Sequence, residues 1–160
     1  MNQGGEDWVL LAYRLPRVPS TPRSSVWRKL KRLGVAQLGD GLVALPADAR
    51  TREQLDWIAE EVTDHGGEAI VWLGRPVGET AEAAIIKRMT ASIAAEYDAV
   101  AAEAASMRTA DAATRTRAIE RLRRELHRIR ARDYFLTPSY DKARGAVEDL
   151  ATTRTVKARA

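Results

Sequence analysis

The stretch that decides the fold opens with WVLLAYRL, residues 8–15, a continuous apolar run closed by Pro16. Such a run is typical of a central strand that is covered on at least one face. Val35 to Leu38 and Leu42 to Leu45 are shorter apolar runs on either side of Gly39-Asp40-Gly41, and a Gly/Asp turn between two such runs indicates a β-hairpin. The first half of the chain therefore predicts a sheet.

Two amphipathic helices and a last strand complete this half. From Arg23 to Leu33 the apolar residues recur at helical spacing. A second helix is predicted from Thr51, which has Gln54 at the spacing of a capping box, to about His65. The segment from Glu68 to Leu73 then predicts a fourth strand.

The order β-α-β-β-α-β is the ferredoxin-like arrangement, in which the first and third strands are central. We therefore expect an α+β fold, with a ferredoxin-like domain at residues 1–78 and a helical extension at residues 79–160. The residues expected in the core of the first domain are Leu10, Leu11, Leu30, Leu33, Val43, Leu55, Ile58 and Ile70.

The second half is rich in Ala and Arg and has helical character almost throughout. Two long helices, residues 80–107 and 109–136, carry apolar residues three and four positions apart, which predicts a long antiparallel hairpin packed along these stripes. Asp133 interrupts the second stripe, and a short terminal helix from Tyr140 to Leu150 precedes a frayed tail. The residues expected to be buried in the hairpin are Ile93, Val100, Leu122, Leu126 and Ile129.

The composition excludes several kinds of chemistry. The 160 residues contain no Cys, which excludes disulfides, a thiol nucleophile and Cys-based metal sites. His65 and His127 stand alone, and we find no P-loop, GxGxxG or GxSxG motif. The sequence predicts no catalytic, cofactor or metal site, so we expect a protein that is not an enzyme. With neither a signal peptide nor a long apolar run, it is expected in the cytoplasm and away from membranes.

Basic residues gather in two places, and the net charge is +4. No acidic residue occurs from Trp8 to Gly39, where the predicted helix carries Arg28, Lys31 and Arg32. In the second place, four arginines at positions i, i+4, i+7 and i+11 form a ridge about 16 Å long on one helix face. These ridge arginines are Arg117, Arg121, Arg124 and Arg128.

The ridge has three possible explanations. A row of guanidinium groups suits contact with DNA phosphates, because each can hold two oxygens in a planar fork. Alternatively it is a solvated helix face, on which Glu120 pairs with Arg124 and Glu125 reaches Arg121 or Arg128. An acidic surface on a partner protein is the third explanation.

Three segments resemble the N-terminal domain of the ChrB-type chromate-resistance regulators. They are WVLLAYRLPRVPSTPRSSVWRKLKRLGVAQLGDGLVALP, REQLDWIAEEVTDHGGEAIVWLG and, for the family's second helical block, RRELHRIRARDYF. The resemblance spans about Trp8 to Leu150 and implies a DNA-binding regulator of a chromate efflux gene in the bacterial cytoplasm. The positions that carry the family motif are Tyr13, Arg14, Pro16, Ser20, Arg23, Trp27, Arg28, Lys29, Lys31, Arg32 and Gly34.

The partners expected for such a regulator are double-stranded DNA, a second copy of the chain, and chromate or another oxyanion as effector. Family members commonly carry a second, C-terminal domain. If effector sensing belongs to that domain, this chain binds DNA without sensing chromate itself. Two alternatives stay open: an interaction module that dimerises through its helical hairpin, and a vestigial ferredoxin-like nuclease. The first strand ends Tyr13-Arg14-Leu15-Pro16 without an acidic residue, which disfavours the nuclease.

Overall fold

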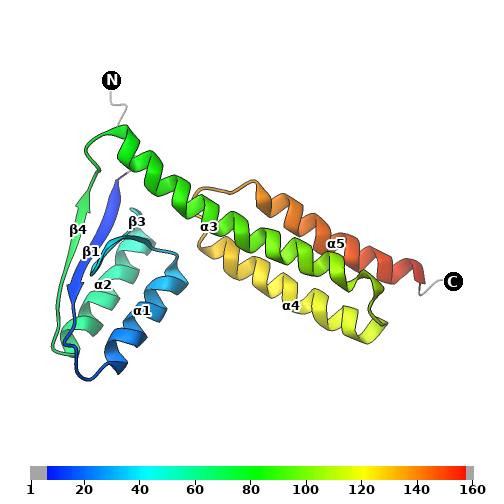
Figure 1. The fold of residues 1–160 in the computed structure, drawn as a ribbon, viewed down its shortest axis with the longest axis horizontal. Helices are drawn as coiled ribbons and strands as arrows, with labels where there is room; N and C mark the ends of the chain where they lie inside the picture. Colours follow the sequence, from blue (N-terminus) through cyan, green and yellow to red (C-terminus); the bar gives the residue numbers. More distant parts are fainter. Residues whose placement is uncertain (1–6, 158–160) are drawn as a thin grey trace. The chain divides into compact units, whose positions relative to one another are not determined.

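A computed structural model describes residues 7–157 as a mixed α/β protein with a four-stranded antiparallel sheet (Figure 1). The chain forms two compact units that divide within one long helix, after Met89. The elements are β1 (Trp8–Arg14), α1 (Thr21–Leu33), β2 (Ala36–Gly39), β3 (Leu42–Pro46), α2 (Ala49–Asp64), β4 (Glu68–Gly74), α3 (Glu79–Ser106), the 3-10 turn η1 (Met107–Thr109), α4 (Ala112–Ala131) and α5 (Ser139–Lys157).

The sheet has the strand order β2-β3-β1-β4, so β1 and β3 are central and β4 is an edge. The predicted hairpin between β2 and β3 is confirmed, and the pair is antiparallel. Its turn is fixed by Gly41, which has φ of +71° and whose carbonyl oxygen accepts a 2.8 Å hydrogen bond from the backbone N–H of Tyr13. A Cβ at Gly41 would clash with the carbonyl oxygen of Tyr13, so glycine is required there.

Helices α1 and α2 lie on the same side of the sheet (Figure 1). Alternate residues of β1, Val9 and Leu11, are fully buried beneath them. Burial confirms five of the expected core residues of this unit, which are Leu11, Leu30, Val43, Leu55 and Ile58.

Three expected core residues are more exposed than predicted. Ile70 is 56% exposed, and Leu10 and Leu33 are only half-buried. Side chains alternate along β4, and Val71 lies beside α2, so Ile70 and Trp72 point to the opposite face. The helices cover only one face of the edge strand β4. Its continuous apolar run therefore does not indicate that both faces are buried.

The start of α2 also differs from the prediction. The helix begins at Ala49, and the capping box is formed by Asp48 and Thr51 instead of Thr51 and Gln54. The Asp48 carboxylate accepts a 2.7 Å hydrogen bond from the Thr51 N–H, and the Thr51 hydroxyl accepts one of 2.9 Å from the Asp48 N–H. An acidic N-cap with Thr at the third position satisfies the same donors as the usual Ser/Thr and Glu/Gln pair.

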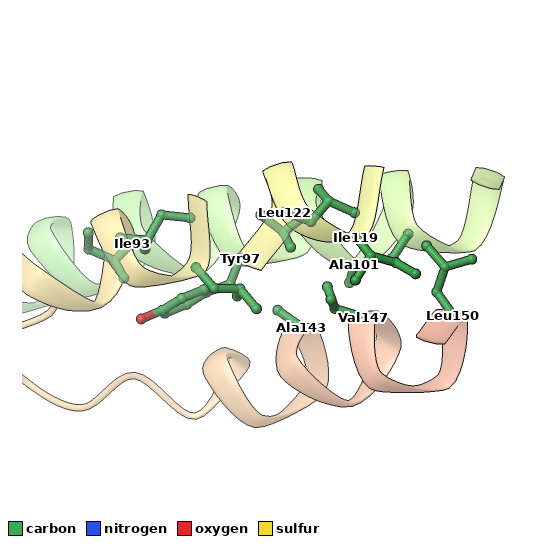
Figure 2. Packing of buried hydrophobic residues seen from close by; sticks show 12 residues of the cluster. Ile93, Tyr97, Ala101, Ile119, Leu122, Ala143, Val147 and Leu150 are labelled. Carbon is green, nitrogen blue, oxygen red and sulfur yellow. The ribbon is translucent and has the colours of Figure 1, made fainter. Parts of the chain in front are cut away.

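The second unit contains three helices that share one core, and Figure 2 shows their apolar side chains meeting. The five residues expected in the hairpin are all buried. However, α5 is longer than the short terminal helix that we expected, and it continues to Lys157, into the tail that we expected to be frayed. It contributes Ala143, Val147 and Leu150 to the core, each at most 1% exposed.

Helix α4 ends at Ala131, five residues before the predicted end at residue 136. Asp133 is buried and organises the loop to α5: its carboxylate accepts hydrogen bonds from the Thr137 N–H at 3.0 Å and the Thr137 hydroxyl at 2.8 Å. The residue that interrupts the apolar stripe therefore lies just beyond the end of α4 and holds the loop that leads to α5.

Candidate nucleic-acid interface

The basic residues of α1 lie on its outer face. Val26 and Leu30 turn inward and are fully buried, so helical periodicity leaves Arg28, Lys31 and Arg32 exposed. None of these three forms an ion pair within residues 7–157. Their neighbour Lys29 instead donates a 2.5 Å hydrogen bond to Glu61 of α2, so the acidic helix neutralises only part of this surface.

The ridge arginines of α4 are also exposed. The opposite face of the helix, with Ile119, Leu122 and Leu126, packs into the three-helix core. Because arginines at i, i+4, i+7 and i+11 fall on one side of a helix, the four guanidinium groups share the solvent face. The helix face that the sequence predicts for the ridge is therefore the solvent-exposed face of α4.

Two of the ridge arginines are engaged with the protein itself. Arg121 donates a hydrogen bond to Glu103 of α3, and this bond lowers the pKa of the Glu103 carboxyl. Arg128 lies 3.2 Å from Glu125. Both ion pairs are exposed to water, where such pairs add little stability.

The other two ridge arginines, Arg117 and Arg124, have no ion-pair or hydrogen-bond partner within residues 7–157. In particular, the pair between Glu120 and Arg124 that the sequence predicts does not form there. Both arginines line a shallow hollow of about 470 Å³, together with Thr114. The ridge thus presents two free guanidinium groups beside a concave surface.

Not every arginine of this region belongs to the surface. Arg132 makes two 2.5 Å hydrogen bonds to Glu96 of α3, and Arg130 stacks on the Tyr140 ring at 4.4 Å while it approaches Asp133. Arg115 is 3% exposed and donates to the carbonyl oxygen of Ala110. Some arginines of this segment therefore stabilise the fold, and others are exposed to solvent.

The two predicted clusters belong to different compact units. Arg28, Lys31 and Arg32 belong to the first compact unit, and the ridge on α4 belongs to the second.

Sequence reasoning missed a cavity of about 670 Å³ between the end of β1, the start of α1 and the β2–β3 turn. Tyr13, Arg23 and Trp27 are among its lining residues. Burial raises the pKa of the Tyr13 hydroxyl, and the nearby charge of Arg23 opposes this shift. The signal was present in the sequence, because Ser20, Arg23 and Trp27 have the i, i+3, i+7 spacing of one helix face.

Within residues 7–157 no group of three or more His, Cys, Asp or Glu side chains is placed to hold a metal ion. In the same part of the chain, no helix has the length and apolar character needed to span a bilayer.

Residues 23–110, more than half of the chain, match the family described as Protein ChrB, N-terminal. The chain belongs to this ChrB N-terminal family. The matched range includes all of α1 after its first two residues, and it ends just before α4. The ridge of α4 and the motif positions before Arg23 therefore lie outside it.

Among curated proteins, the chain is similar to Protein ChrB of Cupriavidus metallidurans (strain ATCC 43123 / DSM 2839 / NBRC 102507 / CH34). The two are 36% identical over 66 residues, which are 41% of this chain and 20% of that protein. The chain thus corresponds to a minor part of its ChrB relative. No solved structure matches the chain.

Proposed function

We propose that this chain is a DNA-binding transcriptional regulator, or the DNA-binding module of one, of the chromate-resistance type. The observation that carries the proposal is the ridge of α4, with four exposed arginines of which Arg117 and Arg124 have no partner in residues 7–157. Membership of the ChrB N-terminal family supports the regulatory role.

The ridge suits the DNA backbone for a geometric reason. Its guanidinium groups project from one rigid helix over about 16 Å, and each can bind two phosphate oxygens at once. Arg117 and Arg124 can do so without giving up a protein contact. Arg121 and Arg128 must first leave exposed glutamate partners, which costs little.

Helix α1 supplies the second proposed contact. Arg28, Lys31 and Arg32 are exposed on the helix that the family match covers, and long cationic side chains there can reach base edges as well as phosphates. The ridge then supplies affinity that does not depend on sequence, and α1 supplies discrimination between sequences.

We also propose the finer organisation that this function needs. The element order and the strand order β2-β3-β1-β4 support a division into a ferredoxin-like domain, proposed at residues 1–78, and a helical extension, proposed at residues 79–160, that carries the ridge. The regulator acts in the cytoplasm without catalysis, as a homodimer, and chromate or a related oxyanion reaches it as effector.

The direct test is an electrophoretic mobility shift with duplex DNA from upstream of the chain's own coding region, and with random duplex of the same length. Each is run at two salt concentrations, with and without chromate. We expect a shift whose affinity falls steeply with salt, because bound phosphates release counterions. No shift at low salt would overturn the proposal and favour the interaction module.

A further inference from the structure

The strongest unassigned feature is the cavity of about 670 Å³ at the end of β1. Its volume lies within the range of small-molecule sites, about 300–1,000 Å³. We propose that this cavity binds a nucleotide unit, with a phosphate held by α1 and a base stacked on aromatic side chains.

The phosphate contacts come from one face of α1. Ser20, Arg23 and Ser24 line the cavity and lie at i, i+3 and i+4, so their polar groups converge. The Ser20 hydroxyl makes no capping hydrogen bond, and Arg23 has no ion-pair partner within residues 7–157. Two hydroxyl donors and a guanidinium fork are the groups that bind phosphate oxygens well.

The base contacts come from two aromatic side chains. Trp27 lies one turn after Arg23 on the same face of α1, and Tyr13 reaches the cavity from β1. Both are half-buried, so the protein holds them while part of each remains open to a ligand. A nucleobase stacks on such rings whatever its identity.

Asp40 decides between a nucleotide and a bare oxyanion. Its carboxylate lines the same cavity, from the turn between β2 and β3. A negative charge there disfavours small dianions such as inorganic phosphate. The same carboxylate accepts a hydrogen bond from a base amino group or a sugar hydroxyl, which a nucleotide has and an oxyanion lacks.

This inference goes beyond the proposed function, because it requires no contact between the α4 ridge and duplex DNA. A free nucleotide and a nucleotide in a single strand share the chemistry described. The experiment below therefore decides which of these two ligands the cavity binds.

The test is isothermal titration calorimetry on the full chain. The probes are the four 2′-deoxynucleoside 5′-monophosphates, the matching nucleosides and inorganic phosphate. The variants are Arg23→Gln and Trp27→Leu. Their matched controls are Arg52→Gln, an exposed arginine of α2 outside the cavity, and Trp57→Leu, an exposed tryptophan of the same helix.

At least one monophosphate should bind about tenfold tighter than both its nucleoside and inorganic phosphate, since stacking and phosphate contacts each contribute. Arg23→Gln and Trp27→Leu should each weaken that binding about tenfold, and the controls should leave it unchanged. Asp40→Asn should raise the affinity for inorganic phosphate. Circular dichroism verifies that the variants fold, and Arg23 is exposed, so its variant tests the site even if Trp27→Leu unfolds.

No binding of any monophosphate would overturn the proposal, as would equal binding of inorganic phosphate or equal losses in the controls. A 5′-phosphorylated single strand that binds tenfold tighter than the mononucleotide, with the same sensitivity to Arg23→Gln, assigns the site to nucleic acid. Equal affinities assign it to a free nucleotide. A ridge variant that loses duplex binding but keeps mononucleotide binding separates this proposal from the function proposed above.

Discussion

Tyr97 of α3 donates a 3.1 Å hydrogen bond to the carboxylate of Asp133, which lies 36 positions later in the chain. Both residues are buried, and the same carboxylate holds the backbone N–H of Thr137. One acidic side chain thus joins α3 to the loop between α4 and α5. This junction lies two residues after the end of α4, the helix that carries the arginine ridge.

The junction makes stability depend on pH in the alkaline range. Burial, and then the negative charge of Asp133, raise the pKa of Tyr97 from 10.0 to about 12. Since the folded state favours the neutral phenol, this stabilisation is fully present below pH 10 and is lost as the pH rises towards 12.

Tyr97→Phe should therefore lower the free energy of unfolding at pH 8, and the difference from wild type should shrink between pH 10 and 12. Urea titrations across this range measure it, with Tyr140→Phe as the control for loss of a tyrosine in the same core. A difference that stays constant with pH would show that Tyr97 does not titrate as described.

The third helix of the core gives a second prediction. Leu150 of α5 is fully buried in the same cluster as Leu122 and Val147. Leu150→Ala should lower the free energy of unfolding by about 2–5 kcal/mol, as Leu126→Ala in α4 should, because each leaves a cavity. Urea melts with Arg124→Ala as an exposed control measure both. If Leu126→Ala lowers the free energy of unfolding and Leu150→Ala does not, α5 does not pack against the other two helices in solution.

The capping box of α2 gives a third prediction. Asp48→Ala should destabilise the protein by about 1 kcal/mol, because it leaves the Thr51 N–H without its acceptor. Gln54→Ala, at the position where the sequence first indicated a cap, should cost less. Thermal unfolding of the two variants compares them, and equal losses would contradict the observed cap.

Much of the sheet could be predicted from the sequence because strands and turns leave local signals. The apolar runs and the Gly39-Asp40-Gly41 turn gave the strands of the first half to within a residue or two. Ile70 was misjudged because an apolar residue on an edge strand looks the same whether or not its face is covered. The predicted capping box at Thr51 and Gln54 is wrong because the helix uses an acidic N-cap, Asp48, with Thr51 at its third position, in place of the usual Ser/Thr with Glu/Gln.

The candidate site was predictable only where it follows helical periodicity. The exposure of the ridge arginines comes directly from their spacing. The pairing of Arg121 with Glu103 and the bond between Tyr97 and Asp133 join different helices, and no local pattern specifies them. The cavity at the end of β1 is formed by three elements that only folding brings together.

A fourth prediction concerns α1. Replacing Arg28, Lys31 and Arg32 by Ala should weaken discrimination between the chain's own upstream duplex and random duplex more than it flattens the salt dependence, if this helix reads bases. Fluorescence anisotropy with both duplexes measures the two quantities. A loss that is equal for both sequences would assign α1 to the backbone alone.

The central claim is tested most directly by the salt dependence of duplex binding by the ridge variants. Replacing Arg117, Arg121, Arg124 and Arg128 by Ala should make the slope of log affinity against log salt shallower by up to about 3–4, at about 0.9 per phosphate contact. The variant should keep its helical content, because Ala is the best helix former. The Arg117/Arg124 double variant, whose arginines have no partner in residues 7–157, should show about half of the change, and the Arg121/Arg128 pair should show a similar share because its exposed ion pairs cost little to break. A folded quadruple variant with unchanged affinity and slope would contradict the claim that this ridge binds DNA.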